Sequence, residues 1–319
     1  MRTTLLKAFG LLLALTTTVT AQEYPTKALR LIIPFSPGGS VDIIGRIAAA
    51  RLGERLGKQV VVDNRPGAGG IIATELAINA PPDGHTLLLV SLAHAVNPWV
   101  YKPNYDPLKA FVPVASLGNG ASLLTVNPSV PAKSVKELIA LAKSKPGTLH
   151  FAHAGIGSFT HIASVLFAMM ADVDVVQVPF KGGGPAMIDV VGGHTQLLMN
   201  SLVASMPHVR SGKLRALGVS DTRRSALLPD LPTIDEAGVP GYAAANWWGI
   251  AVPVGTPQPV VARLNREITD LIRSDEVSKQ FAAQGAVPVP MTTPEFQKFY
   301  ADELAKWGKV VKAANIKPE

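Results

Sequence analysis

Short apolar runs alternate with longer amphipathic stretches along most of the chain. The run Leu29–Ile33 is typical of a buried strand, and the stretch from Val41 to Leu56 has apolar residues at helical spacing. Gly57 follows where a left-handed residue would end that helix. Because such strands are usually covered by helices on both faces, the pattern predicts an α/β fold.

The order of strand, loop and helix recurs along the chain. A capping box of Ser134 and Glu137 predicts the start of one helix, and Pro146 with Gly147 predicts its end. The other strands are expected at Val60–Val62, Thr86–Val90, Leu149–Ala152, Val175–Val178 and Leu214–Val219. The other helices are expected at Ile71–Ile78, at Phe159–Met170, from Pro185 as a first helical residue, at Pro259–Ala283 and after Thr292-Thr293-Pro294.

The chain length favours two lobes over one, because single cores seldom grow much past roughly 250 residues and this chain has 319. Four glycine-rich loops fall into two pairs, so we place the crossings between lobes near Thr125 and Trp247. On this interpretation residues 22–125 and 248–319 form the first lobe, and residues 126–247 form the second.

The N-terminus has the order of features found in a signal peptide. Arg2 and Lys7 precede a short apolar run at Leu11–Leu15, and small residues lead to a cleavage site near Ala21. An uncleaved membrane anchor is the alternative, although a spanning helix needs about 20 apolar residues. We therefore expect residues 1–21 to be removed and the mature protein to be soluble in the periplasm.

Composition excludes several classes of site and partner. The chain has no cysteine, so it has no disulfide, no thiolate metal site and no lipid-modified cysteine. Its formal net charge of +7 becomes +5 without Arg2 and Lys7, and no basic run stands out. We expect a monomer that does not bind nucleic acid.

Four loops share one design, in which glycines lie between a strand and a helix. Helix N-termini carry unpaired N–H groups and the positive end of the helix dipole, and glycine lets an anion approach the backbone. Such loops gather at the carboxyl ends of strands in open α/β sheets, so they suggest one ligand held from both lobes. Tight structural turns are the alternative. The loops are Ser36–Ser40, Arg65–Gly70, Gly155–Ser158 and Lys181–Gly184.

Side chains in or near these loops have two possible roles each. Ser40 is expected as an N-cap, and Asp42 suits either the first helical turn or ligand contact. Ser158 could cap its helix or bind a carboxylate, and His161 faces the same way one turn later. Lys181 is the cation next to the second-lobe loops, and it either meets the ligand or is simply solvated.

The motifs of common enzymes are missing. The chain has no Gly-x-Ser-x-Gly, no His-Glu-x-x-His and no Gly-x4-Gly-Lys-Ser/Thr. His150 and His153 should point to opposite faces of a strand, which argues against a metal site. Trp247 and Trp248 either wall the cleft or fill the core. We therefore expect no catalytic residue, no metal and no cofactor.

Over the whole mature chain, the sequence resembles the substrate-binding receptors of tripartite tricarboxylate transporters, or Bug receptors. No single block decides this, but the set in this order is specific. The matching blocks are Ile33–Asp42, Val62–Gly70, Pro82–Leu87, Val178–Gly182, Ser211–Leu217 and Pro253–Pro257.

The resemblance implies a two-lobed periplasmic binding protein fold with a ligand cleft between the lobes. It implies capture of a small organic carboxylate, such as a di- or tricarboxylate, an aromatic acid or an amino acid, for a membrane permease. A receptor that feeds a membrane sensor is the alternative, and a hydrolase of carboxylated substrates is a more distant one. Phe180 stands where many relatives have Tyr, and Asn200 stands where an acidic residue is common. The implied ligand contacts are Pro34, Phe35, Gly38, Gly39, Ser40, Ser91, Gly155, Ser158, Lys181 and Gly182.

Overall fold

A computed structural model describes residues 24–318, and the predicted signal peptide lies outside this range. The strands are β1 (Leu29–Ile33), β2 (Val60–Asn64), β3 (Thr86–Ser91), β4 (Phe111–Val126), β5 (His150–His153), β6 (Val176–Pro179), β7 (Leu197–Ser201), β8 (Arg215–Val219), β9 (Ala245–Pro253) and β10 (Ala286–Val287). The helices are α1 (Ser40–Leu56), a 3-10 turn at Ala68–Gly70, α2 (Ile71–Ile78), α3 (Leu92–Tyr101), α4 (Val135–Ser144), α5 (Phe159–Ala171), α6 (Gly183–Gly192), α7 (Leu202–Arg210), α8 (Gln258–Arg273), α9 (Asp275–Ala283) and α10 (Thr293–Ala313).

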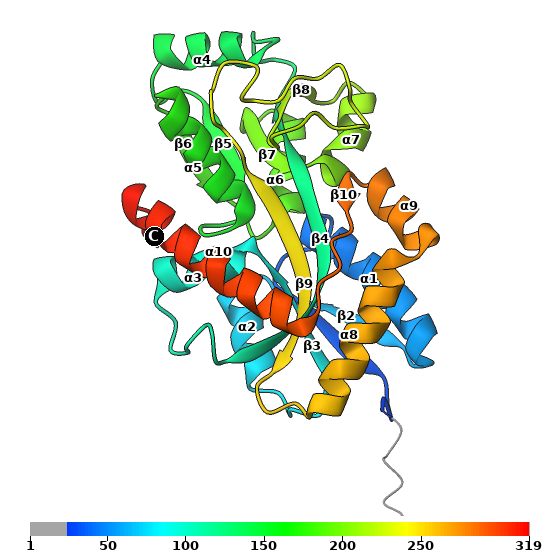
Figure 1. Ribbon diagram of the computed structural model, residues 1–319. Coiled ribbons are helices and arrows are strands. Elements are labelled where there is room, and N and C mark those ends of the chain that lie inside the picture. Colours follow the sequence, from blue (N-terminus) through cyan, green and yellow to red (C-terminus); the bar gives the residue numbers. More distant parts are fainter. Residues whose placement is uncertain (1–23, 319) are drawn as a thin grey trace, which may run out of the picture.

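Two long antiparallel strands, β4 and β9, join the two halves of the molecule (Figure 1). The sheet order is β2-β1-β3-β9-β4-β7-β5-β6, with β8 and β10 also paired to β4. β1, β2 and β3 are parallel in one half, and β5, β6 and β7 are parallel in the other. β4 pairs with β9 along Phe111–Ala121 and with β7 along Ser122–Val126, so one strand belongs to both halves.

The C-terminal helix lies on the half that contains the N-terminal strands. In Figure 1, α10 lies beside α3. The indole Nε1 of Trp99 in α3 donates to the carbonyl of Leu304, 2.8 Å away. The Tyr300 hydroxyl donates to the carbonyl of His94 at 3.1 Å. These contacts tie the last segment of the chain to the first half.

The apolar periodicity places α1 as expected. Ile44 and Leu52 are buried against β1 and β3, in a cluster that also holds residues of α8. Gly57 adopts φ 64°, a left-handed conformation that suits glycine, and its N–H donates to the carbonyl of Glu54. The predicted capping box forms only in part: the N–H of Glu137 donates to Ser134 Oγ at 3.2 Å, whereas the Glu137 carboxylate accepts from the N–H of Lys133 at 2.7 Å and not from that of Ser134.

The predicted helix Pro259–Ala283 is wrong as a single element, since Ser274 divides it into α8 and α9. Ser274 is extended at ψ 141°, and its side chain accepts from the N–H of Val277. Asp275 and Glu276 then occupy the first turn of α9, where their charges favour the positive end of the dipole. The sequence Ser-Asp-Glu at positions 274–276 is typical of a helix start and indicates the break, whereas apolar periodicity alone does not.

Two helices begin at residues other than those predicted, and the two tryptophans have the second of their two possible roles. Gly39, not Ser40, is the N-cap of α1. α6 begins at Gly183, which makes Pro185 its third residue and not its first. Trp247 and Trp248 fill the core: both are buried, and the Trp247 Nε1 donates to Glu303 Oε2 at 3.0 Å.

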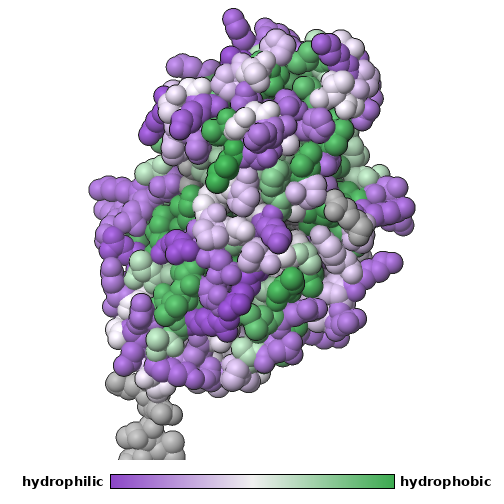
Figure 2. All heavy atoms as spheres, turned by 180° about the vertical axis from the view of Figure 1, so that it is seen from behind, coloured by the Kyte–Doolittle hydropathy of each residue, from purple (hydrophilic) through white to green (hydrophobic). Residues whose placement is uncertain are grey.

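Polar and apolar side chains are interspersed on the face shown in Figure 2. No helix within residues 24–318 combines the length and apolar character required to traverse a lipid bilayer.

Candidate functional site

A small cavity lies where the N-terminal turns of four helices meet. Its volume is about 30 Å³, on the scale of one or two water molecules. The N-terminal turns of α1, α5 and α6 line it, together with Ser91, which is the N-cap of α3. The lining residues are Phe35, Gly39, Ser40, Val41, Ser91, Ala154, Ser158, Phe159, Thr160, Gly183, Asn200 and Asn246.

Half of the residues that line the cavity have polar side chains, and none of these lining residues is ionisable. Its polar side chains are all neutral and buried, and they are those of Ser40, Ser91, Ser158, Thr160, Asn200 and Asn246. The first N–H groups of each helix lack an intrahelical acceptor, and each helix start carries partial positive charge. Four such starts around one cavity favour an anion over a neutral or cationic guest.

The first loop is held in place by a buried carboxylate. Asp42 is 3 % exposed, and its oxygens accept from the N–H of Gly38 at 3.0 Å and from the side chain of Arg46 at 2.9 Å. Asn64 Nδ2 donates both to Asp42 at 2.9 Å and to the carbonyl of Phe35 at 2.9 Å. Asp42 therefore stabilises the first loop through these hydrogen bonds, and it is not among the residues that line the cavity.

Loops from the two halves touch directly beside the cavity. Both the N–H and the hydroxyl of Ser36 donate to the carbonyl of Lys181, at 3.3 and 3.0 Å. A Cβ added to Gly184 would overlap the carbonyl oxygen of Pro37, and one added to Gly182 would lie 2.9 Å from the nitrogen of Ser36. Only glycine permits this approach, so the two loops close on each other through bare backbone.

The loop Arg65–Gly70 makes a separate contact between the halves. Asn97 Nδ2 donates to the carbonyl of Gly69, which fixes this loop on α3. The hydroxyl of Tyr101, also on α3, donates to the carbonyl of Ile156 at 3.0 Å in the other half. The four loops therefore do not all surround one cavity: three of them do, and the fourth lies at a neighbouring cavity.

That neighbouring cavity has a volume of about 210 Å³ and shares Phe35 and Ala154 with the small one. It is lined by Phe35, Gly67, Ala68, Gly69, Tyr101, Ala154, Gly155, Ile156, Pro179, Phe180 and Lys181. Lys181 is the one cationic residue in this lining. The two cavities therefore differ in charge, because the lining of the small one holds only neutral side chains and that of the larger one includes Lys181.

Seven of the ten predicted contact residues line one or both cavities, and three line neither. Those at the small cavity are Phe35, Gly39, Ser40, Ser91 and Ser158, and those at the larger one are Phe35, Gly155 and Lys181. Of the other three, Pro34 packs against Gly70, Gly38 donates to Asp42, and Gly182 lies against Ser36. Which of the ten touch ligand stays a prediction.

Sequence reasoning did not select several lining residues as ligand contacts. Three of them lie in the first turns of helices that follow predicted glycine loops, namely Val41 in α1 and Phe159 and Thr160 in α5. Gly183 lies within the predicted loop Lys181–Gly184. Asn200 was noted only as a departure from the family, and Asn246 was missed. The sequence offers one signal, because each asparagine lies among apolar residues of a strand. A buried side-chain amide requires a hydrogen-bond partner, so its presence there indicates a polar site.

Ser158 and His161 both hold the third loop. Ser158 Oγ accepts from the N–H of His161 at 3.3 Å, so it caps α5 while it also lines the cavity. His161 Nδ1 accepts from the N–H of Gly157 at 3.3 Å, and its ring lies 4.4 Å from that of His153. Burial lowers the pKa of His161 to about 4 and that of His153 to about 3, which keeps both rings neutral at pH 7.

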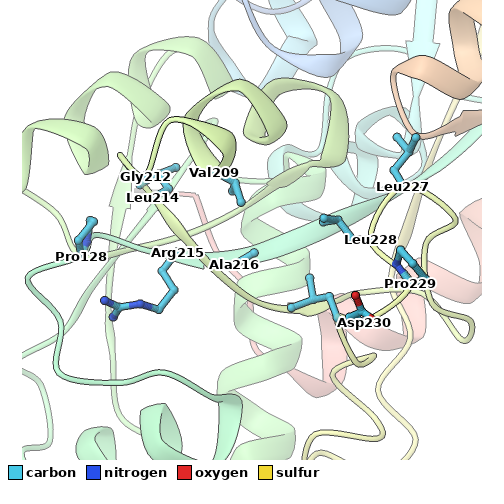
Figure 3. Close-up of a pocket in the computed structure, with 11 residues that line it drawn as sticks. Pro128, Val209, Gly212, Leu214, Arg215, Ala216, Leu227, Leu228, Pro229 and Asp230 are labelled. Carbon is cyan, nitrogen blue, oxygen red and sulfur yellow. The ribbon is translucent and has the colours of Figure 1, made fainter.

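A surface cavity of about 720 Å³ lies elsewhere, on the second half. Val209 and Leu214 lie on one side of it, with Leu228 and Pro229 on the other (Figure 3). Its lining comes from the end of α7, from β8, from the segment 227–231 and from Pro128, Gly212 and Leu214, so no helix N-terminus within residues 24–318 opens into it. We therefore assign the site to the two cavities between the loops.

Comparison with known families agrees with this geometry. The model for the tripartite tricarboxylate transporter family receptor matches residues 44–316. The chain belongs to this family. It is 37% identical to protein BugT of Bordetella pertussis over 99% of this chain and 98% of that protein. Members are periplasmic receptors that bind small carboxylates and work with membrane transporter components, and they are not enzymes.

Solved structures of family members have the same two-lobed fold. The solved structure of an R. palustris protein with adipate has a TM-score of 0.90 and 37% identity, covering 93% of this chain and 100% of that one. MatC of Rhodopseudomonas palustris, with bound malate, has a TM-score of 0.86 and 32% identity, covering 90% and 100%. The expected two-lobed periplasmic binding protein fold is thereby confirmed.

Proposed function

We propose that this receptor captures a small organic carboxylate in the periplasm and delivers it, chemically unchanged, to the permease of a tripartite tricarboxylate transporter. The observation that carries the proposal is the meeting of four helix starts around a cavity without a charged side chain. Adipate and malate in the two solved relatives support a carboxylate as the guest.

The paired strands β4 and β9 supply the hinge in this proposal, with lobe borders near Thr125 and Trp247. Only a few backbone positions need to change when two lobes rotate about a pair of strands. Closure then brings Ser36 to the carbonyl of Lys181 and Gly39 to Gly183. Ligand favours the closed form only as far as it binds that form better than the open one.

The side chains around the cavity agree with binding of a ligand that is not chemically changed. In residues 24–318, no serine hydroxyl lining the cavity is hydrogen-bonded to a histidine ring, so none has the activated form of a nucleophile. His161 instead uses its ring nitrogen to hold the N–H of Gly157.

A panel of carboxylates tests the proposal by thermal unfolding and calorimetric titration. Dicarboxylates, tricarboxylates, aromatic acids and amino acids are titrated into the mature chain, with matched amides as controls. A ligand at a hundredfold over its Kd should add about 2.7 kcal/mol to the free energy of unfolding. It should also be recovered unchanged. Stabilisation by the amides as strong as by the acids, or turnover of the ligand, would contradict the proposal.

A further inference from the structure

Two buried asparagines line the small cavity, and the orientation of each side-chain amide is fixed by the backbone. The N–H of Trp247 donates to Asn246 Oδ1 at 3.0 Å, and the N–H of Ser201 donates to Asn200 Oδ1 at 2.8 Å. A backbone N–H can only donate, so the side-chain atom beside it must be the oxygen and not the nitrogen. The other branch of each amide is therefore its NH₂ group, which is a donor.

The NH₂ group of Asn246 has no hydrogen-bond partner within residues 24–318. Its residue is 2 % exposed and lines the small cavity. The NH₂ group of Asn200, by comparison, donates to the carbonyl of Gly183 at 3.4 Å. Buried polar side chains are nearly always paired, so an unpaired donor at a cavity indicates that a guest supplies the acceptor.

The neighbouring hydroxyls have their oxygens engaged as well. Ser158 Oγ accepts from the N–H of His161 at 3.3 Å, and Thr160 Oγ1 accepts from the N–H of Ala154 at 2.7 Å. The two hydroxyl oxygens lie 3.1 Å apart, so one of these groups donates to the other. The residues lining the cavity also include no aspartate or glutamate. A ligand oxygen thus finds a free donor here, whereas a ligand ammonium group finds no anionic partner.

Asn246 belongs to the strands that join the two halves and not to a helix start. It lies on β9 opposite Gly120 of β4. Its donor is therefore additional to the backbone amides at the N-termini of α1, α5 and α6, which suit the ligand's carboxylate. An ammonium group held next to that carboxylate would lose its hydration and face the positive ends of these helices.

Resting on the function proposed above, we infer that Asn246 is a specificity-determining residue. Its NH₂ group donates to an oxygen on the carbon next to the ligand's carboxylate. The receptor then selects a 2-hydroxy or 2-oxo acid over the α-amino acid with the same skeleton, because the hydroxyl or keto oxygen accepts this hydrogen bond and the ammonium group cannot.

Three matched pairs of ligands test this inference on the native chain by calorimetric titration. Malate and aspartate, lactate and alanine, and phenyllactate and phenylalanine each differ only in a hydroxyl against an ammonium group. Every hydroxy acid that binds should bind at least tenfold more tightly than the amino acid of its pair. Equal affinities within a pair, or binding of none of the hydroxy acids, would overturn the inference. The proposed function would fail only if the whole panel of carboxylates failed to bind.

Two variants at Asn246 separate the loss of its donor from damage to the site. Asn246→Asp keeps an oxygen for the N–H of Trp247 but replaces the donor with an anionic oxygen. It should weaken the hydroxy acids at least tenfold and narrow their preference over the amino acids to below threefold. Asn246→Ala removes the donor without adding charge, and it should weaken the hydroxy acids about tenfold while changing the amino acids less than twofold.

Asn119→Asp is the control, because Asn119 is an exposed residue of β4 that lines neither cavity and its change alters the net charge equally. It should leave all affinities unchanged, and thermal unfolding verifies that each variant is folded. Equal losses for hydroxy and amino acids in a folded Asn246→Ala protein would show that Asn246 only supports the structure, which would overturn the inference.

Discussion

Gly184→Ala should lower the affinity for carboxylate ligands between tenfold and a hundredfold while the protein stays folded. A Cβ at this position would overlap the carbonyl oxygen of Pro37, which belongs to the opposite loop. Relief of such overlap typically costs about 1–3 kcal/mol, and each 1.4 kcal/mol is a factor of ten in affinity. Because the clash exists only when the loops meet, it acts on the closed form.

The free energy of unfolding separates this effect from damage to the fold. Gly184 lies in the first turn of α6 without a positive φ, so alanine fits the helix and should keep or raise stability. Gly192→Ala, in the last turn of the same helix, is the control, because its added Cβ meets only the exposed side chain of His194. Native affinity in Gly184→Ala would show that the loops need not meet for binding.

Asp42→Ala should destabilise the protein by about 2–3 kcal/mol and weaken ligand binding about tenfold. The substitution removes a buried acceptor from Gly38, Asn64 and Arg46, and a hydrogen bond to a charged group typically contributes about 1.5–3 kcal/mol. Without the carboxylate, the N–H of Gly38 loses its acceptor, and the loop that contains Gly39 loses the hydrogen bonds that hold its conformation.

Urea unfolding and calorimetric titration measure the two effects of Asp42→Ala. Asp302→Ala removes a carboxylate from an exposed pair with Lys298 and is the control, with an expected change within about 0.5 kcal/mol. A stable Asp42→Ala protein with native affinity would contradict the role of this carboxylate in shaping the loop.

Elements with a strong local pattern could be predicted from sequence. The helix Ile71–Ile78 has the predicted bounds, and Leu29–Ile33 and the start of α5 at Phe159 are also as expected. The glycine loops identified much of the site because glycine between a strand and a helix has a local physical meaning. A local pattern cannot show which loops meet across the halves, and this is why sequence did not separate Arg65–Gly70, which lines the larger cavity, from the three loops at the small one.

Features that depend on distant partners were harder to predict. β4 continues through Pro113, Gly118 and Gly120 because β9, more than a hundred residues later, pairs with it. Asn246 precedes two tryptophans in β9. Asn246 lines the cavity, whereas Trp247 and Trp248 are buried in the core, and this difference depends on how β9 is placed in the sheet. Periodicity describes one element at a time, so it does not report such pairings.

The central claim is that backbone amides at helix starts in both halves bind the ligand's carboxylate. Nuclear magnetic resonance of the mature chain labelled with ¹⁵N-glycine tests it most directly, because Gly39 and Gly183 belong to opposite halves and both line the small cavity. Saturating dicarboxylate should move the amide protons of both residues downfield, as new hydrogen bonds to a charged acceptor form. Shifts confined to glycines away from the loops, with Gly39 and Gly183 unmoved, would contradict the account.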